Sequence, residues 1–126
     1  MKSRIDKIIK AMQKSNLDAI AVIAGPNMAY FTGGDFFLME RPTVLIFSKN
    51  QRPLAILPSL EVDSFQALNF DSEIVAWKDS DGYLDAFVKA GKIIGNVEKI
   101  GVEGQRMRVF EFNAMKHGFP NAEIVN

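Results

Sequence analysis

Apolar residues along this chain follow two patterns, one typical of amphipathic helices and one typical of buried strands. The N-terminal segment carries apolar side chains at three- and four-residue spacing, namely Ile5, Ile8, Ile9 and Met12. Ser3 and Asp6 resemble a capping box that starts this helix, and Asn16 can close it. The run Ala19–Ile23 is continuously apolar and rich in branched residues, as in a strand covered on both faces. The pattern predicts a helix followed by a buried strand.

The same alternation continues through the middle of the chain. Residues 43–48 and 53–57 are apolar runs flanking a short segment whose Asn and following Pro suit a tight connection, which predicts a hairpin. Ser59 can cap a helix that runs to about residue 69, and residues 73–77 form a further strand. Residues 79–82 open a helix whose apolar stripe comprises Leu84, Phe87, Val88 and Gly91.

The C-terminal part predicts a strand at residues 99–103, a helix from about 107 to 117 and a short strand at 123–125. Alternating helices and strands indicate an α/β domain with parallel segments joined by crossovers and one antiparallel hairpin. We therefore expect one three-layer-like domain over residues 1–126, with a mixed, roughly six-stranded sheet flanked by helices. No internal repeat, low-complexity tract or linker interrupts it.

Composition narrows the class of protein. A chain of 126 residues with 48% hydrophobic and 24% charged residues suits one globular domain. Fifteen basic and fifteen acidic residues cancel, which argues against nucleic acid and anionic membranes as partners. The absence of cysteine excludes disulfides and thiolate metal sites. Neither a signal peptide nor an apolar run of about 18 residues is present, so we expect a cytoplasmic location.

A search for catalytic chemistry gives mostly negative results. His117 is the only histidine, so two-histidine metal motifs cannot form within the chain, and no Gly-x-Ser-x-Gly elbow accompanies it. Phosphate-binding glycine loops are absent, and Gly101 with Gly104 predicts a turn. Asp79, Asp81 and Asp85 lie where acidic residues cap a helix, an interpretation we prefer to metal binding. We identify no catalytic residue and no metal ligand in the chain.

The segment GPNMAYFTGG, residues 25–34, combines turn residues with aromatic side chains. Pro26 presets its backbone angle, Asn27 can make an Asx-turn or a helix cap, and Thr32 with Gly33 can stop a helix. The segment therefore predicts one helical turn after the first strand, with Tyr30 and the following Phe facing opposite ways. Tyr30 carries a hydroxyl that needs a polar partner, so we divide its interpretation between core packing and an interface.

Several motifs together resemble the N-terminal domain of the creatinase/prolidase family, which includes Xaa-Pro dipeptidases and aminopeptidase P. The resemblance lies in Arg4, in the Leu-Asp-Ala of residues 17–19, and in an Asn-x-x-Tyr-x-Thr-Gly signature over residues 27–33. The hairpin at residues 41–58, the following helix and the Ile-Gly-Val-Glu at 100–103 extend it over nearly the whole chain. One departure is that Gly34 and Asp35 separate the signature from Phe36, where the family usually has an aromatic directly after the first glycine.

The resemblance implies a ribonuclease H-like fold and a non-catalytic domain of a metal-dependent Xaa-Pro peptidase. Family members add a larger C-terminal catalytic domain that holds two divalent metal ions, manganese, cobalt or zinc, through two Asp, one His and two Glu. With a single His, this chain resembles the N-terminal domain alone and has no cofactor of its own. The implied partners are its own C-terminal catalytic domain and a second copy in a homodimer, with the domain helping to wall the active site.

The row of apolar residues after the signature is the candidate contact surface. Phe36 and Phe37 belong to four successive apolar residues that cannot all turn inward from a loop. We expect this loop to contact a second chain or the catalytic domain, with Asp35, Glu40 and Arg41 as its polar rim. Arg41 offers a planar, bidentate match to a substrate carboxylate. Tyr30 completes this candidate substrate or interface set.

Two alternatives stay open. The parent can be a creatinase-like amidinohydrolase, which shares this N-terminal domain, or the chain can be a stand-alone dimerisation or ligand-binding module. The reading frame after Asn126 discriminates between these possibilities.

Overall fold

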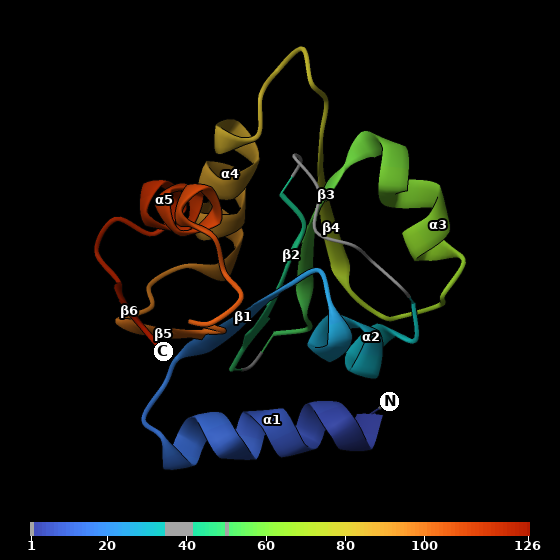
Figure 1. The fold of residues 1–126 in the computed structure, drawn as a ribbon. Coiled ribbons are helices and arrows are strands. Elements are labelled where there is room, and N and C mark those ends of the chain that lie inside the picture. Colours follow the sequence, from blue (N-terminus) through green and yellow to red (C-terminus); the bar gives the residue numbers. More distant parts are fainter. Residues whose placement is uncertain (1, 35–41, 50) are drawn as a thin grey trace.

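A computed structural model describes residues 2–34, 42–49 and 51–126 (Figure 1). Its strands are β1 (Ala19–Ile23), β2 (Val44–Ser48), β3 (Leu54–Pro58), β4 (Glu73–Trp77), β5 (Lys99–Val102) and β6 (Glu123–Val125). Its helices are α1 (Lys2–Lys14), α2 (Pro26–Thr32), α3 (Val62–Gln66), α4 (Leu84–Ile94) and α5 (Val109–Gly118), with a 3-10 turn η1 (Ser59–Glu61) before α3.

The strands form one mixed six-stranded sheet in the order β4-β3-β2-β1-β5-β6. Strand β2 is antiparallel to its neighbours β1 and β3, whereas the pairs β1–β5, β5–β6 and β3–β4 are parallel. All strands except β2 therefore point the same way, and their carboxyl ends lie at one edge of the sheet. The predicted mixed α/β sheet and its hairpin are confirmed.

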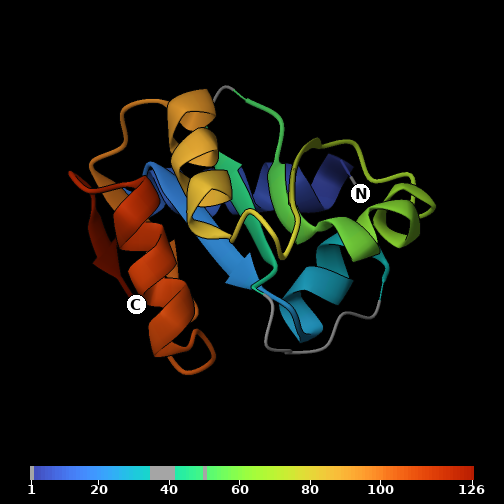
Figure 2. The ribbon, with the colours of Figure 1, turned by 90° about the horizontal axis from the view of Figure 1, so that it is seen from above.

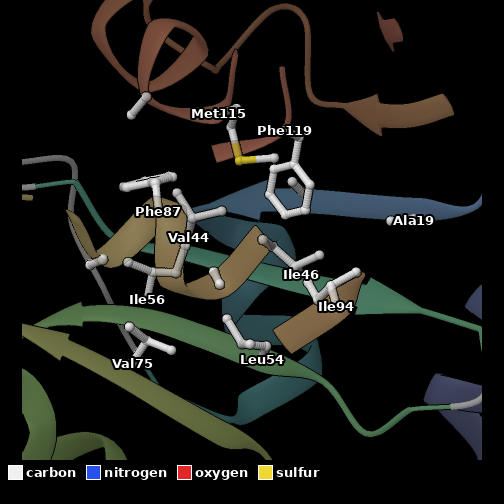
Figure 3. Packing of buried hydrophobic residues seen from close by; sticks show 14 of the residues in the cluster. Ala19, Val44, Ile46, Leu54, Ile56, Val75, Phe87, Ile94, Met115 and Phe119 are labelled. Carbon is white, nitrogen blue, oxygen red and sulfur yellow. The ribbon is translucent and has the colours of Figure 1, made fainter. Parts of the chain in front are cut away.

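Helices cover both faces of the sheet, which gives three layers (Figures 1 and 2). Val44 and Ile46 of β2 pack on the face covered by α4 and α5, where Phe87 and Met115 point toward the sheet (Figure 3). Leu45 and Phe47, the alternate residues, pack on the face covered by α1, α2 and α3. Because the central strands are buried on both sides, their sequences read as continuous apolar runs.

Helices α4 and α5 lie side by side because glycines remove the side chains between them (Figure 2). A Cβ atom on Gly91 would lie 2.1 Å from the carbonyl oxygen of Gly118, and one on Gly118 would lie 2.4 Å from that of Phe87. The predicted stripe of α4 was correct at Phe87 and wrong at Leu84, which is exposed. Ala86, Ala90 and Ile94 complete the buried face, and the two small alanines suit the close contact with α5.

Local capping differs from the sequence predictions at several helices. Helix α1 begins at Lys2, so Ser3 lies inside its first turn instead of capping it. Ser59 lies within η1, where its hydroxyl donates to the carbonyl oxygen of Trp77 at 3.0 Å. The helix expected to run to residue 69 ends at Gln66, and Asn69 then adopts a left-handed conformation with φ of 57°. Side-chain chemistry suggests a cap, but tertiary partners compete for the same groups.

The residues before α4 form a turn instead of the expected cap. The N–H groups of Asp81 and Gly82 both donate to the carbonyl oxygen of Lys78, and Gly82 has φ of 77°. Helix α4 follows from Leu84 with no side-chain hydrogen bond at its N-cap, Tyr83. Asp85 does lie in the first turn, where the helix dipole favours a negative charge.

Candidate functional site

At the carboxyl ends of the neighbouring strands β1 and β5, the chain leaves the sheet toward opposite faces. After β1 the chain passes through α2 on one face toward β2, whereas after β5 it passes through α5 on the other face toward β6. Open α/β sheets bind ligands outside the carboxyl ends of their strands at such positions. The candidate site therefore lies at this edge.

Helix α2 begins directly at this edge because its sequence suits an abrupt turn from strand to helix. Gly25 has φ of 152°, a conformation that side chains disfavour, and Pro26 takes the first helical position. Gly33 closes the helix in a left-handed conformation with φ of 85°, and its N–H donates to the carbonyl oxygen of Ala29 at 2.8 Å. The helix predicted for this segment is confirmed and is longer than the single turn expected.

Glu103, directly after β5, joins that strand to β1 and α2. One carboxylate oxygen accepts the backbone N–H of Ile23 at 2.8 Å, and the other accepts the side-chain amide of Asn27 at 2.6 Å. Of the two expectations for Asn27, an Asx-turn or a helix cap, the cap was wrong, because its amide donates to Glu103 and the N-cap residue is Gly25. We call the contact of Glu103 with Ile23 and Asn27 the Glu103 latch. It fixes where the signature segment leaves the sheet.

Arg106 lies over the Gly25 backbone beside this latch. Its Nη2 donates to the carbonyl oxygen of Ala24 at 3.4 Å, and its Nε lies 4.0 Å from the Glu103 carboxylate. A Cβ atom on Gly25 would lie 2.2 Å from that Nη2 atom. Gly25 is therefore needed for its backbone angle, and the guanidinium lies in the space that its missing Cβ leaves.

A second carboxylate joins the same two strands at their other end. Asp18 accepts the backbone N–H groups of Glu98 at 2.8 Å and Lys99 at 3.1 Å, and Lys49 lies 3.8 Å away. The hydrogen bond from the Glu98 N–H is the largest cause that lowers the pKa of Asp18 below its ordinary value of 3.8. We call this contact the Asp18 latch.

Two of the motifs in the resemblance, Leu-Asp-Ala and Ile-Gly-Val-Glu, meet across this strand pair. Leu17 precedes the Asp18 latch, and a Cβ atom on Gly101 of β5 would lie 2.8 Å from the Leu17 side chain. Gly101 therefore leaves room for Leu17, and the Gly101 and Gly104 pair does not form a phosphate loop: Gly104 instead donates its N–H to the side chain of Asn126 at 3.0 Å. The Leu-Asp-Ala and Ile-Gly-Val-Glu motifs thus act mainly in holding β1 beside β5.

The two aromatic residues of α2 differ in burial, but the prediction that they face opposite ways was wrong, because their rings meet edge-on with centroids 5.1 Å apart. Phe31 is 9% exposed and packs on Phe47 with ring centroids 4.7 Å apart. Tyr30 is 47% exposed, and the Arg4 guanidinium lies 4.2 Å from the centre of its ring. Arg4 also donates to the carbonyl oxygen of Tyr30, which ties the start of α1 to α2.

The other predicted interface residues lie outside the part of the chain that the structure describes. These residues are Asp35, Phe36, Phe37, Glu40 and Arg41. Their contact with a partner or a substrate stays a prediction, together with the interface assignment of Tyr30.

No group of three or more His, Cys, Asp or Glu side chains suited to a metal ion occurs among the described residues. His117 is exposed in the last turn of α5, where a partial negative charge favours a basic side chain. Within the same described ranges, no helix is long and apolar enough to cross a membrane.

Sequence reasoning missed Glu111, which is 1% exposed in the first turn of α5. Its carboxylate accepts Nε of Arg108 at 3.1 Å and Nη2 at 3.2 Å, together with the Arg108 backbone N–H at 3.1 Å. The spacing of three residues at a helix start is the signal that could have found this pair. The pair fixes the start of the helix that follows the Glu103 latch.

Comparison with known proteins agrees with this architecture. Residues 4–126 match the model of the creatinase/prolidase N-terminal domain family. An uncharacterized peptidase of Staphylococcus epidermidis is 28% identical over 112 residues, which cover 88% of this chain and 32% of that protein. A similar peptidase of Staphylococcus aureus is 26% identical over 117 residues, or 92% of this chain and 33% of the relative. The chain therefore spans about a third of the length of the curated relatives it matches.

Solved structures share the fold over almost the whole chain. A prolidase from Thermococcus sibiricus is 28% identical with a TM-score of 0.84, covering 98% of this chain and 33% of that one. The N-terminal domain of an Xaa-Pro dipeptidase from Lactobacillus brevis gives a TM-score of 0.82 at 17% identity, covering 95% of this chain and 90% of that domain. Together with the family match across residues 4–126, these likenesses lead to one conclusion: the chain belongs to the creatinase/prolidase N-terminal domain family.

Proposed function

We propose that this chain is the non-catalytic N-terminal domain of a metal-dependent Xaa-Pro peptidase. The observation that carries the proposal is the family match over residues 4–126 in a chain that spans about a third of its curated relatives. The prolidase from Thermococcus sibiricus, similar at 28% identity, favours a peptidase parent. In this proposal the domain supports dimerisation and walls the active site of the parent.

The residues that the structure describes do not provide the ligands for the metal ions of the proposed parent. A two-metal site needs several carboxylate and imidazole ligands close together, whereas the chain has a single His, exposed on α5, and the described residues hold no suitable cluster. We therefore assign no step of metal chemistry to this chain. In the proposal, the metal ions belong to a further domain of the parent.

The Glu103 latch supports a positioning function for the domain. It fixes the start of α2 on the sheet, and the candidate loop follows α2 in sequence. A rigid attachment of this kind is what a loop needs in order to present side chains to a site on another domain or subunit. Arg41, in the loop, is the residue we propose to contact a substrate carboxylate.

The coding sequence that follows Asn126 provides the first test. We expect it to encode two Asp, one His and two Glu at metal-ligand positions in a catalytic domain. A stop codon directly after Asn126 would contradict the proposal and favour a stand-alone module. Kinetics then separate a peptidase from an amidinohydrolase, because the proposed parent releases proline from Xaa-Pro dipeptides and does not hydrolyse creatine.

Arg41→Ala in the parent tests the contact with substrate. If Arg41 binds the carboxylate equally in the ground and transition states, KM rises and kcat changes little. Lys92→Ala, which removes an exposed basic residue of α4, is the matched control. Unchanged KM and kcat in the Arg41 variant, with an unchanged dimer by sedimentation, would refute both the substrate contact and the interface.

A further inference from the structure

A groove lies between the start of α5 and strand β6, at the carboxyl ends of β5 and β6. Its volume is about 310 Å³. Strand β6 is an edge strand, so its outer side has no neighbour among the described strands. The wall of the groove is mostly apolar and is formed by Val102, Met107, Val109, Phe112, Ile124 and Val125. We call it the α5–β6 groove.

Two large apolar side chains of α5 are exposed at this groove. Val109 is 75% exposed, and Phe112, one helical turn later, is 37% exposed. Residues three apart lie on the same face of a helix, so these two side chains form one stripe. Single exposed apolar residues are common on folded proteins, but a stripe that continues into an apolar groove indicates a contact surface.

The positive charge at the groove is neutralised within the chain. Arg108 is the one charged residue among the described residues of the wall, and its Nε donates to the buried carboxylate of Glu111 at 3.1 Å. Its guanidinium also lies 4.3 Å from the centre of the Phe110 ring. The groove therefore suits the apolar surface of another protein domain better than a charged ligand.

The last residue of the chain is held in this groove. Asn126 lines it, and its side-chain oxygen accepts the backbone N–H of Gly104 at 3.0 Å. Figure 1 shows the C-terminus beside β5 and β6. In the proposed parent, the polypeptide that follows Asn126 therefore starts at the groove.

This position favours the further domain of the parent as the partner over a second copy of the chain. The chain spans about a third of its curated relatives, so the larger part of such a protein lies outside the matched region. A domain joined at Asn126 has a high effective concentration at the groove and can pack on a small apolar surface. A separate second copy lacks that advantage and needs an interface of about 800 Å² on each partner.

We propose that the further domain of the parent packs on the α5–β6 groove and covers Val109 and Phe112 with apolar side chains. This inference rests on the proposed function, because it requires a parent with a further domain. It assigns a contact surface to α5 and β6, whereas the candidate loop follows α2 in sequence.

Cysteine labelling tests this contact because the chain has no cysteine of its own. Val109→Cys places a thiol at a position that is 75% exposed, so the fold should tolerate the change. Leu60→Cys is the matched control, because Leu60 is 76% exposed and lies in η1, away from the groove. Each variant is made in the 126-residue chain and in the parent. Both are treated with a maleimide, and mass spectrometry of the peptides measures labelling at the introduced cysteine.

We expect Val109→Cys to react about tenfold more slowly in the parent than in the isolated chain, as for a surface that is uncovered about a tenth of the time. Leu60→Cys should react at the same rate in both proteins. Equal rates for Val109→Cys in the two proteins would overturn the proposed surface. Slow labelling of Val109→Cys already in the isolated chain, together with a dimer by sedimentation, would assign the groove to a second copy and would also overturn it.

Proline release from an Xaa-Pro dipeptide is measured on the same samples of the parent, which separates this inference from the proposed function. A parent that releases proline but leaves Val109→Cys fully reactive would refute the surface alone. A parent that protects Val109→Cys but releases no proline would support the surface and refute the peptidase function.

Discussion

Replacing Glu103 by Gln tests whether the Glu103 latch holds the signature segment on the sheet. The carboxylate accepts two donors from different elements, the Ile23 N–H at 2.8 Å and the Asn27 amide at 2.6 Å, and its side chain is only 12% exposed. Gln has the same shape but keeps a single acceptor oxygen. Its NH₂ group must then face a donor, unless the amide of Asn27 turns over.

The expected magnitude follows from these contacts. A hydrogen bond to a charged group contributes about 1.5–3 kcal/mol, and a neutral one about 1 kcal/mol. Glu103→Gln replaces two hydrogen bonds to a charged group with one neutral hydrogen bond. If the Asn27 amide turns over, it restores a second neutral hydrogen bond. We therefore expect the free energy of unfolding to fall by about 2 kcal/mol, and by about 3 kcal/mol for Glu103→Ala.

Urea unfolding at neutral pH measures this change in free energy, provided that the variant and the unaltered protein show the same slope of unfolding free energy against urea concentration. Glu98→Gln is the control, because that side chain is exposed near the same strand and only its backbone N–H takes part in a latch. In a double-mutant cycle, Glu103→Gln and Asn27→Ala should show a coupling of about 1 kcal/mol. A Glu103→Gln variant as stable as the Glu98→Gln control would refute the latch.

Three further predictions concern the other contacts. Because the pKa of Asp18 is lowered, its latch should stabilise the fold above pH 3.8 and lose that effect as the pH falls further. Asp18→Asn should therefore lower the melting temperature at pH 7, and the difference from the unaltered protein should shrink in acid. A difference in melting temperature that grows in acid would contradict this prediction. Gly91→Ala raises the helix propensity by about 1 kcal/mol but places a Cβ atom 2.1 Å from the carbonyl oxygen of Gly118. Calorimetry should therefore show a net loss of about 1–2 kcal/mol in the free energy of unfolding. A raised melting temperature would contradict the close contact between α4 and α5. Arg4→Gln should release α2 from α1 and speed amide hydrogen exchange around Tyr30, whereas the control Lys10→Gln should leave the exchange rate unchanged. Equal exchange rates in the two variants would contradict the contact between Arg4 and Tyr30.

Much of the fold could be predicted because the central strands carry strong local signals. Strand β1 was predicted with its observed bounds, and β2 and β3 with an error of about one residue, since a strand buried on both faces leaves a continuous apolar run. Helix ends were predicted less well. Ser59 donates to Trp77, and Asn27 donates to Glu103, so long-range partners took groups that local sequence assigned to caps.

The candidate site was only partly predictable, because some of its contacts join residues that lie far apart in the sequence. The helix of the signature segment followed from residue types within a few positions of one another. Glu103 lies eighty residues after Ile23, the residue whose N–H it accepts, and no local pattern reveals that pairing.

The activity of the purified chain tests the central claim most directly. We predict that it unfolds cooperatively as a folded domain and releases no proline from Xaa-Pro dipeptides, with or without added manganese or cobalt. A proposed parent carrying the further domain should release proline under the same conditions. Metal-dependent release of proline that increases in proportion to the concentration of the highly purified 126-residue chain would contradict the account.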